Sequence, residues 1–569
     1  MRQTFSYCLL VFILALLVRV GGLSNSDIAH FPPAGMVWFD EGLKGVDAWN
    51  TLHGGGFKLV YPDVFPREPL LVWVLAVVMK LFGPKIVLLR LTTAIISSFA
   101  CVAFFLMVRE VEGKRGKGFA LAAAFILCTM HWHAWFGRLL FRTNFVPLIS
   151  SLVVLCMALA ARRTGRFQRL AWAGAGLVWG MGYYTYLSWH FFFPAAIFWL
   201  WALTTSRAVQ PDCVAPLRLR KCALYVVFGV VLMALPMMLH YATASQDLTG
   251  RPTAISPFKD GVGPGIKLML DNLRDVVLMF GIRGDHVPLH NVSPFVDKGQ
   301  PGFGKTGMPV FEPVFALFFF AGIVRALRDA RRGADRATRR ISAAWLVWLG
   351  CMSLPSVVTQ TDSANTLRNL GATPAVAYFV ALGWWWACEA THHVKEQWRK
   401  HVSVLLMLLL LWGAAFQIFK LWVLHPRVQG IERAFTAISA ELTWVCKRDA
   451  KSSPIYVPDM FFNKSFEFLN IDRPDVHRFD PVEAISQGKE NLDHRILCTQ
   501  LEMNYPALQK LFPNGQIEQE KLFMGKQPFA WMFRIPAKDL LPREKAAEAA
   551  AGLGVPTLQP PPASPIERK

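Results

Sequence analysis

The stretch IVLLRLTTAIISSFACVAFFLMV, residues 86–108, contains a single charged side chain, that of Arg90. A helix of about 20 mostly apolar residues is long enough to cross the hydrocarbon core of a bilayer. The stretch therefore predicts a transmembrane helix, and it has counterparts along most of the chain. The runs that we interpret as spans are residues 6–22, 86–108, 119–135, 145–161, 170–187, 191–205, 223–241, 310–324, 341–359, 371–388 and 402–424.

The composition of the whole chain agrees with a membrane protein. Of its 569 residues, 53% are hydrophobic and 17% are charged, whereas about a quarter of the residues of a soluble domain are charged. We expect about eleven transmembrane helices, the first retained rather than cleaved, because no convincing small-residue cleavage site follows it. Residues 70–82 are too short for a span and carry Lys80, which predicts an interfacial or re-entrant helix.

Lysine and arginine indicate the orientation of the chain. With the N-terminus in the cytoplasm, short basic loops fall on the cytoplasmic side, as the positive-inside rule requires. These loops cover residues 109–118, 162–169, 207–221, 325–340 and 391–400. The net charge of +21 is explained largely by these loops, which would face an anionic inner leaflet, and we expect no nucleic-acid partner.

The long connections fall on the opposite, extracytoplasmic side: residues 23–85, residues 242–309 and everything after residue 425. Residues 426–552 combine apolar residues at helical spacing with short strand-like runs at 454–458, 495–499 and 529–535, which predicts a small α/β domain. The proline-rich residues 553–569 predict a disordered tail. The predicted fold class is therefore mainly α: a polytopic bundle over residues 1–425, followed by a small extracytoplasmic α/β domain. Cys446 and Cys498 both fall in this domain, and the sequence leaves open whether they pair.

An acidic pair follows the first apolar segment, in Val37-Trp38-Phe39-Asp40-Glu41-Gly42. Ionisable groups near hydrocarbon cost several kcal/mol unless they are solvated or paired. The pair is therefore a candidate functional group on the outer side, and Asp47 lies seven residues after Asp40, near the same helix face. The alternative is that Asp40 simply begins a helix as its N-cap.

Arginine is uncommon on the predicted outer side, so each of the five arginines named there is informative: Arg138, Arg142, Arg251, Arg283 and Arg368. The positive-inside rule disfavours arginine there unless it has a partner. That partner is either a lipid headgroup or a bound phosphate, whose shape suits the planar guanidinium. Carboxylates that accept a proton and arginines that hold a phosphate, on one face of a membrane, indicate transfer from a lipid-phosphate donor.

Several motifs in residues 1–424 together resemble those of one family. They are Phe39-Asp40-Glu41 after the first span, Arg67-Glu68-Pro69-Leu70 ending in Leu81-Phe82-Gly83, Gly137-Arg138 with Arg142-Thr143-Asn144, Gly182-Tyr183-Tyr184-Thr185-Tyr186, Gly284-Asp285 with His290-Asn291, and Thr366-Leu367-Arg368. Their order and topology are similar to those of the GT-C superfamily of membrane glycosyltransferases. That superfamily includes the protein O-mannosyltransferases, the lipid A aminoarabinose transferase and bacterial family 39-like enzymes. The C-terminal domain matches much less clearly.

The resemblance implies an activity. A sugar would move from polyprenyl phosphate to an acceptor hydroxyl at the outer face, with inversion at the anomeric carbon. Asp40 would act as the general base, and Glu41 would orient Asp40 or contact the acceptor. A positioned carboxylate base contributes about 10²–10⁴-fold to a rate.

The resemblance also implies a donor site. Arg138, Arg142 and Arg368 would bind the donor phosphate. Relatives usually carry arginine where this chain has His190, so the contribution of this position would depend on pH. A packing role is the alternative for His190.

Other residues would contact the acceptor or support the site: Asp47, Arg67, Glu68, Asp285 and Asn291. No cofactor is firmly predicted, although a divalent cation between Asp40, Glu41 and Asp285 is left open. The expected partners are a polyprenyl-phosphate-linked sugar, membrane lipids and a glycan, lipid or protein acceptor. The expected location is a bacterial inner membrane with a periplasmic C-terminal domain.

Two other function classes are left open, namely a flippase or transporter of lipid-linked glycans and a non-catalytic assembly protein. A transporter is expected to place ionisable residues at mid-membrane. The predicted spans are nearly free of them, which favours the enzyme.

Overall fold

A computed structural model describes residues 2–21, 37–62, 66–205, 219–293, 307–360, 364–428, 437–449, 453–458, 462–488, 492–498, 505–521 and 528–552. Its contacts divide the chain into two compact units. Unit 1 comprises residues 1–34 and 54–431, and unit 2 comprises residues 35–53 and 432–569. The sequence placed residues 35–53 with the bundle, whereas their contacts place them with the C-terminal part. The tail predicted at residues 553–569 lies outside the described residues.

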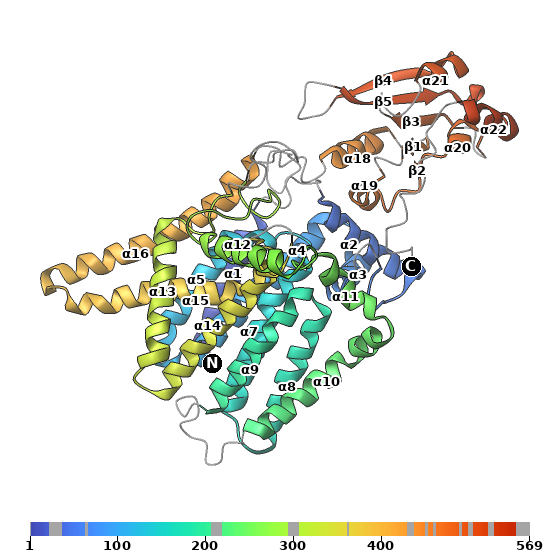
Figure 1. The fold of residues 1–569 in the computed structure, drawn as a ribbon. Coiled ribbons are helices and arrows are strands. Elements are labelled where there is room, and N and C mark those ends of the chain that lie inside the picture. The colour runs from blue at the N-terminus through green and yellow to red at the C-terminus, as the bar shows by residue number, and fades with distance from the viewer. Residues whose placement is uncertain are drawn as a thin grey trace. The chain divides into compact units, whose positions relative to one another are not determined.

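Unit 1 is a bundle of helices (Figure 1). Its helices are α1 (Arg2–Val20), α3 (Leu70–Phe82), α4 (Ile86–Val111), α5 (Gly116–Thr129), α6 (His131–Phe136), α7 (Phe145–Ala161), α8 (Gly165–Met181), α9 (Phe192–Thr205), α10 (Leu219–Thr243), α11 (Ser245–Ala254), α12 (Val262–Leu278), α13 (Pro313–Arg332), α14 (Arg336–Val357), α15 (Thr373–Ala390) and α16 (Glu396–Phe419). Each of the eleven predicted spans coincides with a helix, and the predicted short helix at residues 70–82 is α3.

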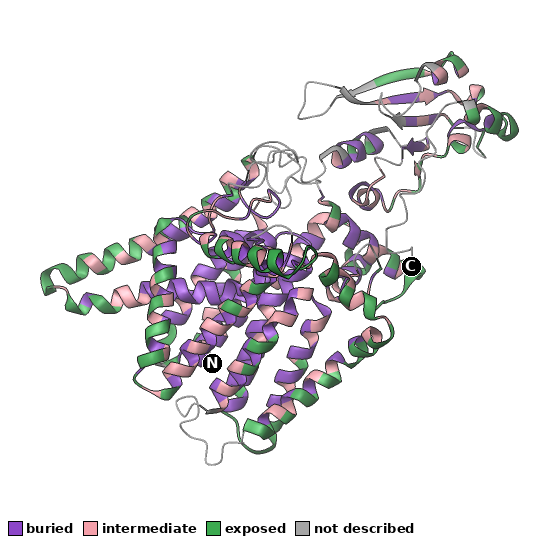
Figure 2. Cartoon of the chain, in the orientation of Figure 1, coloured by how far each residue is buried: buried purple, intermediate pink, exposed green. Residues whose placement is uncertain are grey.

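Seven helical stretches in the described residues are long and apolar enough to cross a membrane: Gln3–Val20, Ile86–Val111, Arg142–Ala161, Leu187–Thr204, Leu219–Thr243, Arg336–Val357 and Glu396–Arg427. Their outward sides carry exposed residues (Figure 2), and many of these are large and apolar. On α10, for example, Leu224, Phe228 and Leu239 are each at least 60% exposed. A soluble protein rarely exposes so much apolar surface, so the chain is a multi-span membrane protein, mainly α as predicted.

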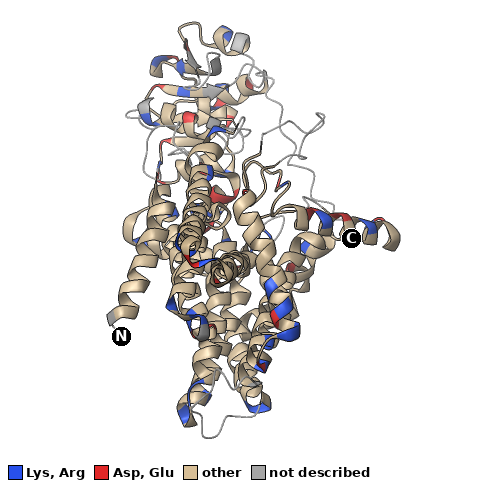
Figure 3. Cartoon of the chain, turned by 90° about the vertical axis from the view of Figure 1, so that its left-hand side faces the viewer, with Lys and Arg blue, Asp and Glu red and all other residues tan. Residues whose placement is uncertain are grey.

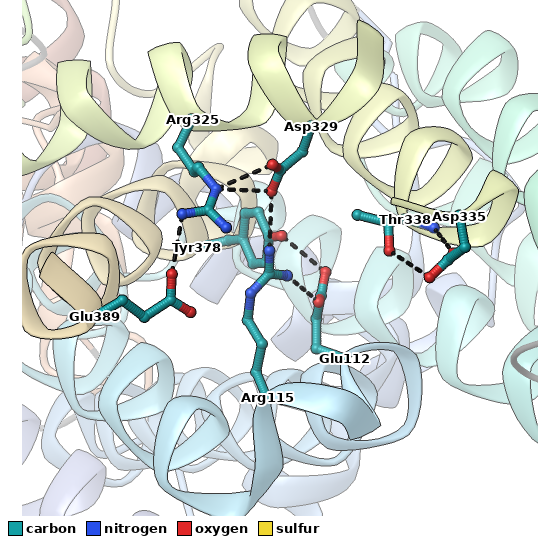
Figure 4. A network of polar contacts seen from close by, with 8 residues as sticks. All are labelled: Glu112, Arg115, Arg325, Asp329, Asp335, Thr338, Tyr378 and Glu389. Atoms are coloured by element: carbon teal, nitrogen blue, oxygen red, sulfur yellow. Dashed lines mark hydrogen bonds and ion pairs between the residues drawn. The ribbon is translucent and has the colours of Figure 1, made fainter. Parts of the chain in front are cut away.

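Basic residues gather at one end of the bundle helices (Figure 3), where the sequence predicts the cytoplasmic loops. A polar network there, the Arg115 network, joins residues of α13, α15 and the turn between α4 and α5 (Figure 4). It consists of Glu112, Arg115, Arg325, Asp329, Tyr378 and Glu389.

Arg115 is the centre of this network. It forms an ion pair with Glu112, and its Nη2 donates to Asp329 at 3.1 Å. The Tyr378 hydroxyl donates to Glu112 at 2.7 Å. Arg325 links Asp329, at 3.0 Å, to Glu389, at 2.9 Å. The carboxylates therefore bridge separate helices at this end of the bundle.

Unit 2 contains a five-stranded sheet in the order β2-β1-β3-β5-β4. The strands are β1 (Ile455–Val457), β2 (Val476–Arg478), β3 (His494–Cys498), β4 (Gln516–Lys521) and β5 (Pro528–Ile535). Pairs β2–β1 and β1–β3 are parallel, whereas β3–β5 and β5–β4 are antiparallel. Three strands and the α/β class agree with the sequence prediction. The sequence missed β2, which is only three residues long, and β4, whose residues are almost all polar.

The helices of unit 2 are α2 (Phe39–Asn50), α18 (Ala437–Asp449), α19 (Lys464–Leu469), α20 (Pro481–Ile485), α21 (Tyr505–Leu511) and α22 (Arg543–Gly552). One hydrophobic cluster joins α18 and α19 to the sheet through Leu442, Val445, Phe466, Ile455 and Met532. Cys446 also lies in this cluster. The α2 helix packs against α19.

Candidate active site

A cavity of about 390 Å³ lies in unit 1, beside the C-terminal end of α14. We call it the arginine cavity. The surface of this cavity is mainly apolar, and the polar residues that line it are Tyr186, Ser188, His190, Thr249, Arg251, Thr253, Thr359 and Arg368. Ligand pockets typically have this character, with apolar walls and a few positioned polar groups. The structure therefore brings two of the predicted phosphate ligands, His190 and Arg368, to one cavity.

The short 3-10 helix η5 (Leu187–Phe191), which follows Tyr186, positions His190. The Nδ1 of His190 lies 2.9 Å from the carbonyl oxygen of Leu187. A carbonyl oxygen only accepts, so Nδ1 is the protonated nitrogen of this contact. Nε2 is then the ring nitrogen that this contact leaves to face other groups.

Tyr186 connects Arg142 to the cavity. The guanidinium carbon of Arg142 lies 5.5 Å from the centroid of the Tyr186 ring, and that of Arg251 lies 5.8 Å from it. Both are within the range of cation–π attraction, about 6 Å. Arg142 is buried and forms an ion pair with Glu68, so Glu68 neutralises it next to the cavity.

A smaller polar pocket adjoins the arginine cavity and shares Leu187, Leu248 and Arg251 with it. Arg67, Glu68 and Asp247 also line this pocket. The backbone of Arg67 forms two hydrogen bonds of 3.0 Å with Tyr61. The predicted support residues Arg67 and Glu68 thus lie next to the cavity and on its charged side.

The turn that carries Arg368 is tightly held. Its Ala364 has a φ of +58°, a left-handed conformation that is uncommon for residues with a Cβ and often persists at functional sites. Ser356 on α14 donates from Oγ to the carbonyl oxygen of Asn365 at 3.0 Å. Arg368 donates from its backbone to Asn365 at 2.9 Å and from Nη1 to Thr359 at 2.8 Å.

Asp285 holds this turn from the loop that follows α12. Its Oδ2 accepts the backbone N–H of Thr366 at 2.7 Å and the Thr366 hydroxyl at 2.8 Å. The backbone N–H of Val287 and the ring of His290 bond the same carboxylate at 2.9 and 3.1 Å. Asp285 is fully buried. Both of its oxygens are occupied by donors, so this carboxylate gives no support to the divalent cation that the sequence left open.

The surroundings of Asp285 favour its charged form. Burial by itself would raise the pKa of its carboxyl group. The charge and hydrogen bond of His290, with the backbone N–H groups of Val287 and Thr366, outweigh burial and hold that pKa below its ordinary value. The neighbouring Asn291 donates to the carbonyl oxygens of Asp285 at 2.9 Å and Met308 at 2.6 Å, and so it braces the loop.

Arg138 does not line the arginine cavity. It is fully buried and donates from Nη2 to the carbonyl oxygen of Gly21 at 2.5 Å. Burial, together with the charges of Arg90 and Arg19, lowers the pKa of Arg138 to about 9. The structure thus separates Arg138, in a buried basic group with Arg19 and Arg90, from the Arg142, His190 and Arg368 group.

The acidic pair lies in unit 2, at the start of α2. Glu41 is buried, and its Oε2 accepts the backbone N–H of Trp38 at 3.2 Å, which caps the helix. The Asp40 side chain is 48% exposed, and Lys44 Nζ lies 4.0 Å from its Oδ2. Asp47 is half-buried on the same helix. Of the two acids, Asp40 is therefore the accessible one.

In the described part of the chain, no group of three or more His, Cys, Asp and Glu side chains has an arrangement that could hold a metal ion.

Comparisons with known proteins agree on the architecture. Residues 66–240 match the family model described as dolichyl-phosphate-mannose-protein mannosyltransferase. The fold is similar to that of ArnT from Cupriavidus metallidurans, solved without ligand, at 12% identity and a TM-score of 0.51, covering 95% of this chain and 99% of that one. ArnT bound to undecaprenyl phosphate gives 13% identity and a TM-score of 0.50, covering 95% of this chain and 98% of that one.

The fold is that of the GT-C membrane glycosyltransferases. A second GT-C structure, the oligosaccharyltransferase of Archaeoglobus fulgidus in its apo form, is 15% identical with a TM-score of 0.52. That match covers 86% of this chain but 66% of the archaeal protein, slightly less than two thirds of its length. No curated protein matches the chain in sequence.

The sequence did not single out Arg251 as a ligand within this GT-C fold. Arg251 lies in α11, in a polar stretch without helical periodicity or a recognisable motif. Its only signal was that arginine is uncommon on the outer side. The wall of the cavity combines residues from η5, α11, α14 and the turn before α15, and only folding brings these segments together.

Proposed function

We propose that this protein is an integral membrane glycosyltransferase that moves a sugar from a polyprenyl-phosphate donor to an acceptor hydroxyl on the extracytoplasmic face. The observation that carries the proposal is the arginine cavity, where Arg251, Arg368 and His190 lie in a mainly apolar lining in a chain with the GT-C fold. Such a site suits a ligand with an anionic head and a hydrocarbon chain.

The cationic groups of the cavity support donor binding. Arg251 and Arg368 would hold the phosphate through charge-assisted hydrogen bonds, which are stronger than neutral ones. Arg142 would act from beside the cavity, where Tyr186 and Glu68 hold it. Undecaprenyl phosphate bound to ArnT is a precedent for a ligand of this class on the same fold.

The chemistry is a single displacement. The acceptor oxygen attacks the anomeric carbon while Asp40 takes the hydroxyl proton. The bond between that carbon and the phosphate oxygen breaks, and polyprenyl phosphate leaves with the electron pair. The configuration at the anomeric carbon inverts. Cationic groups that face the phosphate stabilise the charge that collects on it.

The proposal also covers the sugar, the acceptor and the membrane in which the enzyme lies. The sugar is a hexosyl or pentosyl group, and the acceptor is a glycan, a lipid or a protein. The enzyme lies in a bacterial inner membrane, with its N-terminus in the cytoplasm and its C-terminal domain in the periplasm. The basic loops at one end of the bundle (Figure 3) support this orientation under the positive-inside rule.

The test uses the full chain in membranes or proteoliposomes, with a polyprenyl-phosphate sugar as donor. Asp40→Asn should lower kcat by about 10²–10⁴-fold, because it removes the base, while the KM for the donor stays close to the native value. The matched control is Asp472→Asn, an exposed position of unit 2, which should leave both constants unchanged.

Arg368→Ala should raise the KM for the donor at least tenfold, which corresponds to about 1.4 kcal/mol of lost binding. The two variants together separate the function classes. If Asp40→Asn retained sugar transfer at normal abundance, the catalytic role of Asp40 would be wrong. If no preparation transferred sugar but the protein moved lipid-linked glycan between leaflets, the transporter would replace the enzyme.

A further inference from the structure

Two glycines on one face of α2 allow the helix that carries Asp40 to touch the C-terminal domain. Gly42 and Gly45 are three residues apart, so they lie on the same side of the helix. Both face α19. The contact lies inside unit 2, which joins residues 35–53 to residues 432–569.

The contact leaves no room for side chains. A Cβ on Gly42 would lie 2.4 Å from the carbonyl oxygen of Lys464 and 2.7 Å from Cα of Ser465. A Cβ on Gly45 would lie 2.3 Å from Cδ2 of Phe468. Real Cβ contacts are essentially never shorter than 3.0 Å. The two helices therefore meet through backbone at Gly42 and through the Phe468 ring at Gly45.

The α19 helix is itself firmly attached to its domain. Its N-cap residue, Asn463, accepts the backbone N–H groups of Ser465 at 3.0 Å and Phe466 at 3.1 Å. The Nδ2 of Asn463 donates to Oγ of Ser439 on α18 at 3.0 Å. Phe466 is buried in the cluster that covers the sheet. A helix held in this way provides a rigid surface for α2.

The same contact between α2 and α19 determines which of the two acidic side chains, Asp40 or Glu41, is exposed. Gly42 follows Asp40 by two residues, which is roughly 200° around a helix. With the glycine face against α19, Asp40 points away from that contact and is 48% exposed. Glu41 is buried and caps the helix. Lys44 Nζ donates to the backbone carbonyl of Asp40 at 2.9 Å.

We propose that α19 is a positioning element for the general base: through Gly42 and Gly45 of α2, the C-terminal domain sets where the Asp40 carboxylate stands. Phe468 is then a positioning residue that never touches substrate. The inference rests on the proposed function of Asp40. It predicts that turnover depends on the α2–α19 contact, whereas donor binding does not.

The experiment measures kcat and the KM for the donor in full-length Gly45→Ala, Gly42→Ala and their combinations with Phe468→Leu. Gly45→Ala should lower kcat at least tenfold with an unchanged donor KM, since a misplacement of about 1 Å costs about 10²-fold in rate. Phe468→Leu in the Gly45→Ala background should restore part of kcat, because it removes the ring atoms that the new methyl group meets.

Gly42→Ala provides the internal control for that rescue. Its methyl group would meet the backbone of Lys464 and Ser465, so Phe468→Leu should not restore its turnover. The general control is Gly174→Ala on α8, where an added Cβ has no neighbour within 4 Å. Membrane abundance and the thermal midpoint are measured for every variant. If Gly45→Ala does not accumulate, Phe468→Ala empties the same contact without a clash, and kcat should fall with donor KM unchanged.

The outcomes separate this inference from the function on which it rests. If Asp40→Asn abolishes transfer while Gly42→Ala and Gly45→Ala keep native kcat, only the positioning role is wrong. If Gly45→Ala lowers kcat and Phe468→Leu does not restore part of it, the proposed role of the contact between Gly45 and Phe468 is also wrong. If Asp40→Asn is fully active, the proposed role of Asp40 as general base is wrong, whatever the activity of the glycine variants.

Discussion

The carboxylate of Asp285 accepts the backbone N–H of Thr366 at 2.7 Å and the Thr366 hydroxyl at 2.8 Å. These residues are far apart in sequence, and their contact joins the long outer loop to the turn that carries Arg368. Arg368 lines the arginine cavity. A carboxylate remote from the proposed phosphate site therefore helps to place one of its ligands.

Asp285→Asn should weaken donor binding. The change keeps the shape of the side chain but removes the charge and turns one acceptor into a donor that faces N–H and O–H groups. A hydrogen bond to a charged group contributes about 1.5–3 kcal/mol, so we expect an affinity for undecaprenyl phosphate at least tenfold lower. Direct binding of that lipid measures the effect. Asp271→Asn, an exposed position on α12, is the matched control, and native affinity in Asp285→Asn would refute the link to Arg368.

The same carboxylate predicts a pH dependence of stability. The pKa of Asp285 in the folded protein is below its ordinary value, which is about 3.9 in an unfolded chain. Its contribution to stability is therefore fully present above about pH 4 and is lost as the pH falls through the folded pKa. The thermal midpoint of the native protein should exceed that of Asp285→Asn at neutral pH, and the difference should shrink below about pH 4. A difference that stays constant on acidification would contradict this assignment.

His190→Arg should tighten donor binding. Arginine stays charged at every accessible pH, and its planar guanidinium suits a phosphate. The affinity for undecaprenyl phosphate should therefore rise. His392→Arg, at an exposed position in the predicted cytoplasmic turn after α15, is the control for added charge. An unchanged affinity in His190→Arg would favour the packing role of His190.

The Arg115 network predicts a stability effect without a catalytic one. Arg115→Met leaves the carboxylates of Glu112 and Asp329 without the cation that joins them (Figure 4). Breaking a buried pair costs about 3–5 kcal/mol, so the thermal midpoint in detergent should fall clearly. Arg169→Met, which is exposed on α8, should change stability by less than about 0.5 kcal/mol. Donor affinity should be native in both variants, and a stable Arg115→Met protein would show that the network does not hold the helices together.

Some features of this protein could be predicted from its sequence and others could not. The helices of the bundle were predictable, because apolar runs are a local property of the sequence and each of the eleven predicted spans falls on helix. Seven helical stretches in the described residues are long and apolar enough to cross a membrane. The strand β4, with the sequence Gln516-Ile517-Glu518-Gln519-Glu520-Lys521, was not predictable, because an edge strand has little to bury and its residues show no alternation. Among the site residues, only Arg368 and His190 were predicted and also line the cavity, whereas Arg138 lies buried elsewhere and Arg251 was not singled out as a ligand.

The sequence by itself determined the class of this protein. Hydropathy and the distribution of lysine and arginine are local properties that predict a multi-span membrane protein, and its motifs already resembled the GT-C enzymes. Only the tertiary structure decided which charged residues meet. The cavity gathers side chains from η5, α11, α14 and the turn before α15, and α2 joins the C-terminal unit through Gly42 and Gly45. Such contacts depend on packing between segments that are distant along the chain, and no local pattern records the distance between two residues that meet only after folding.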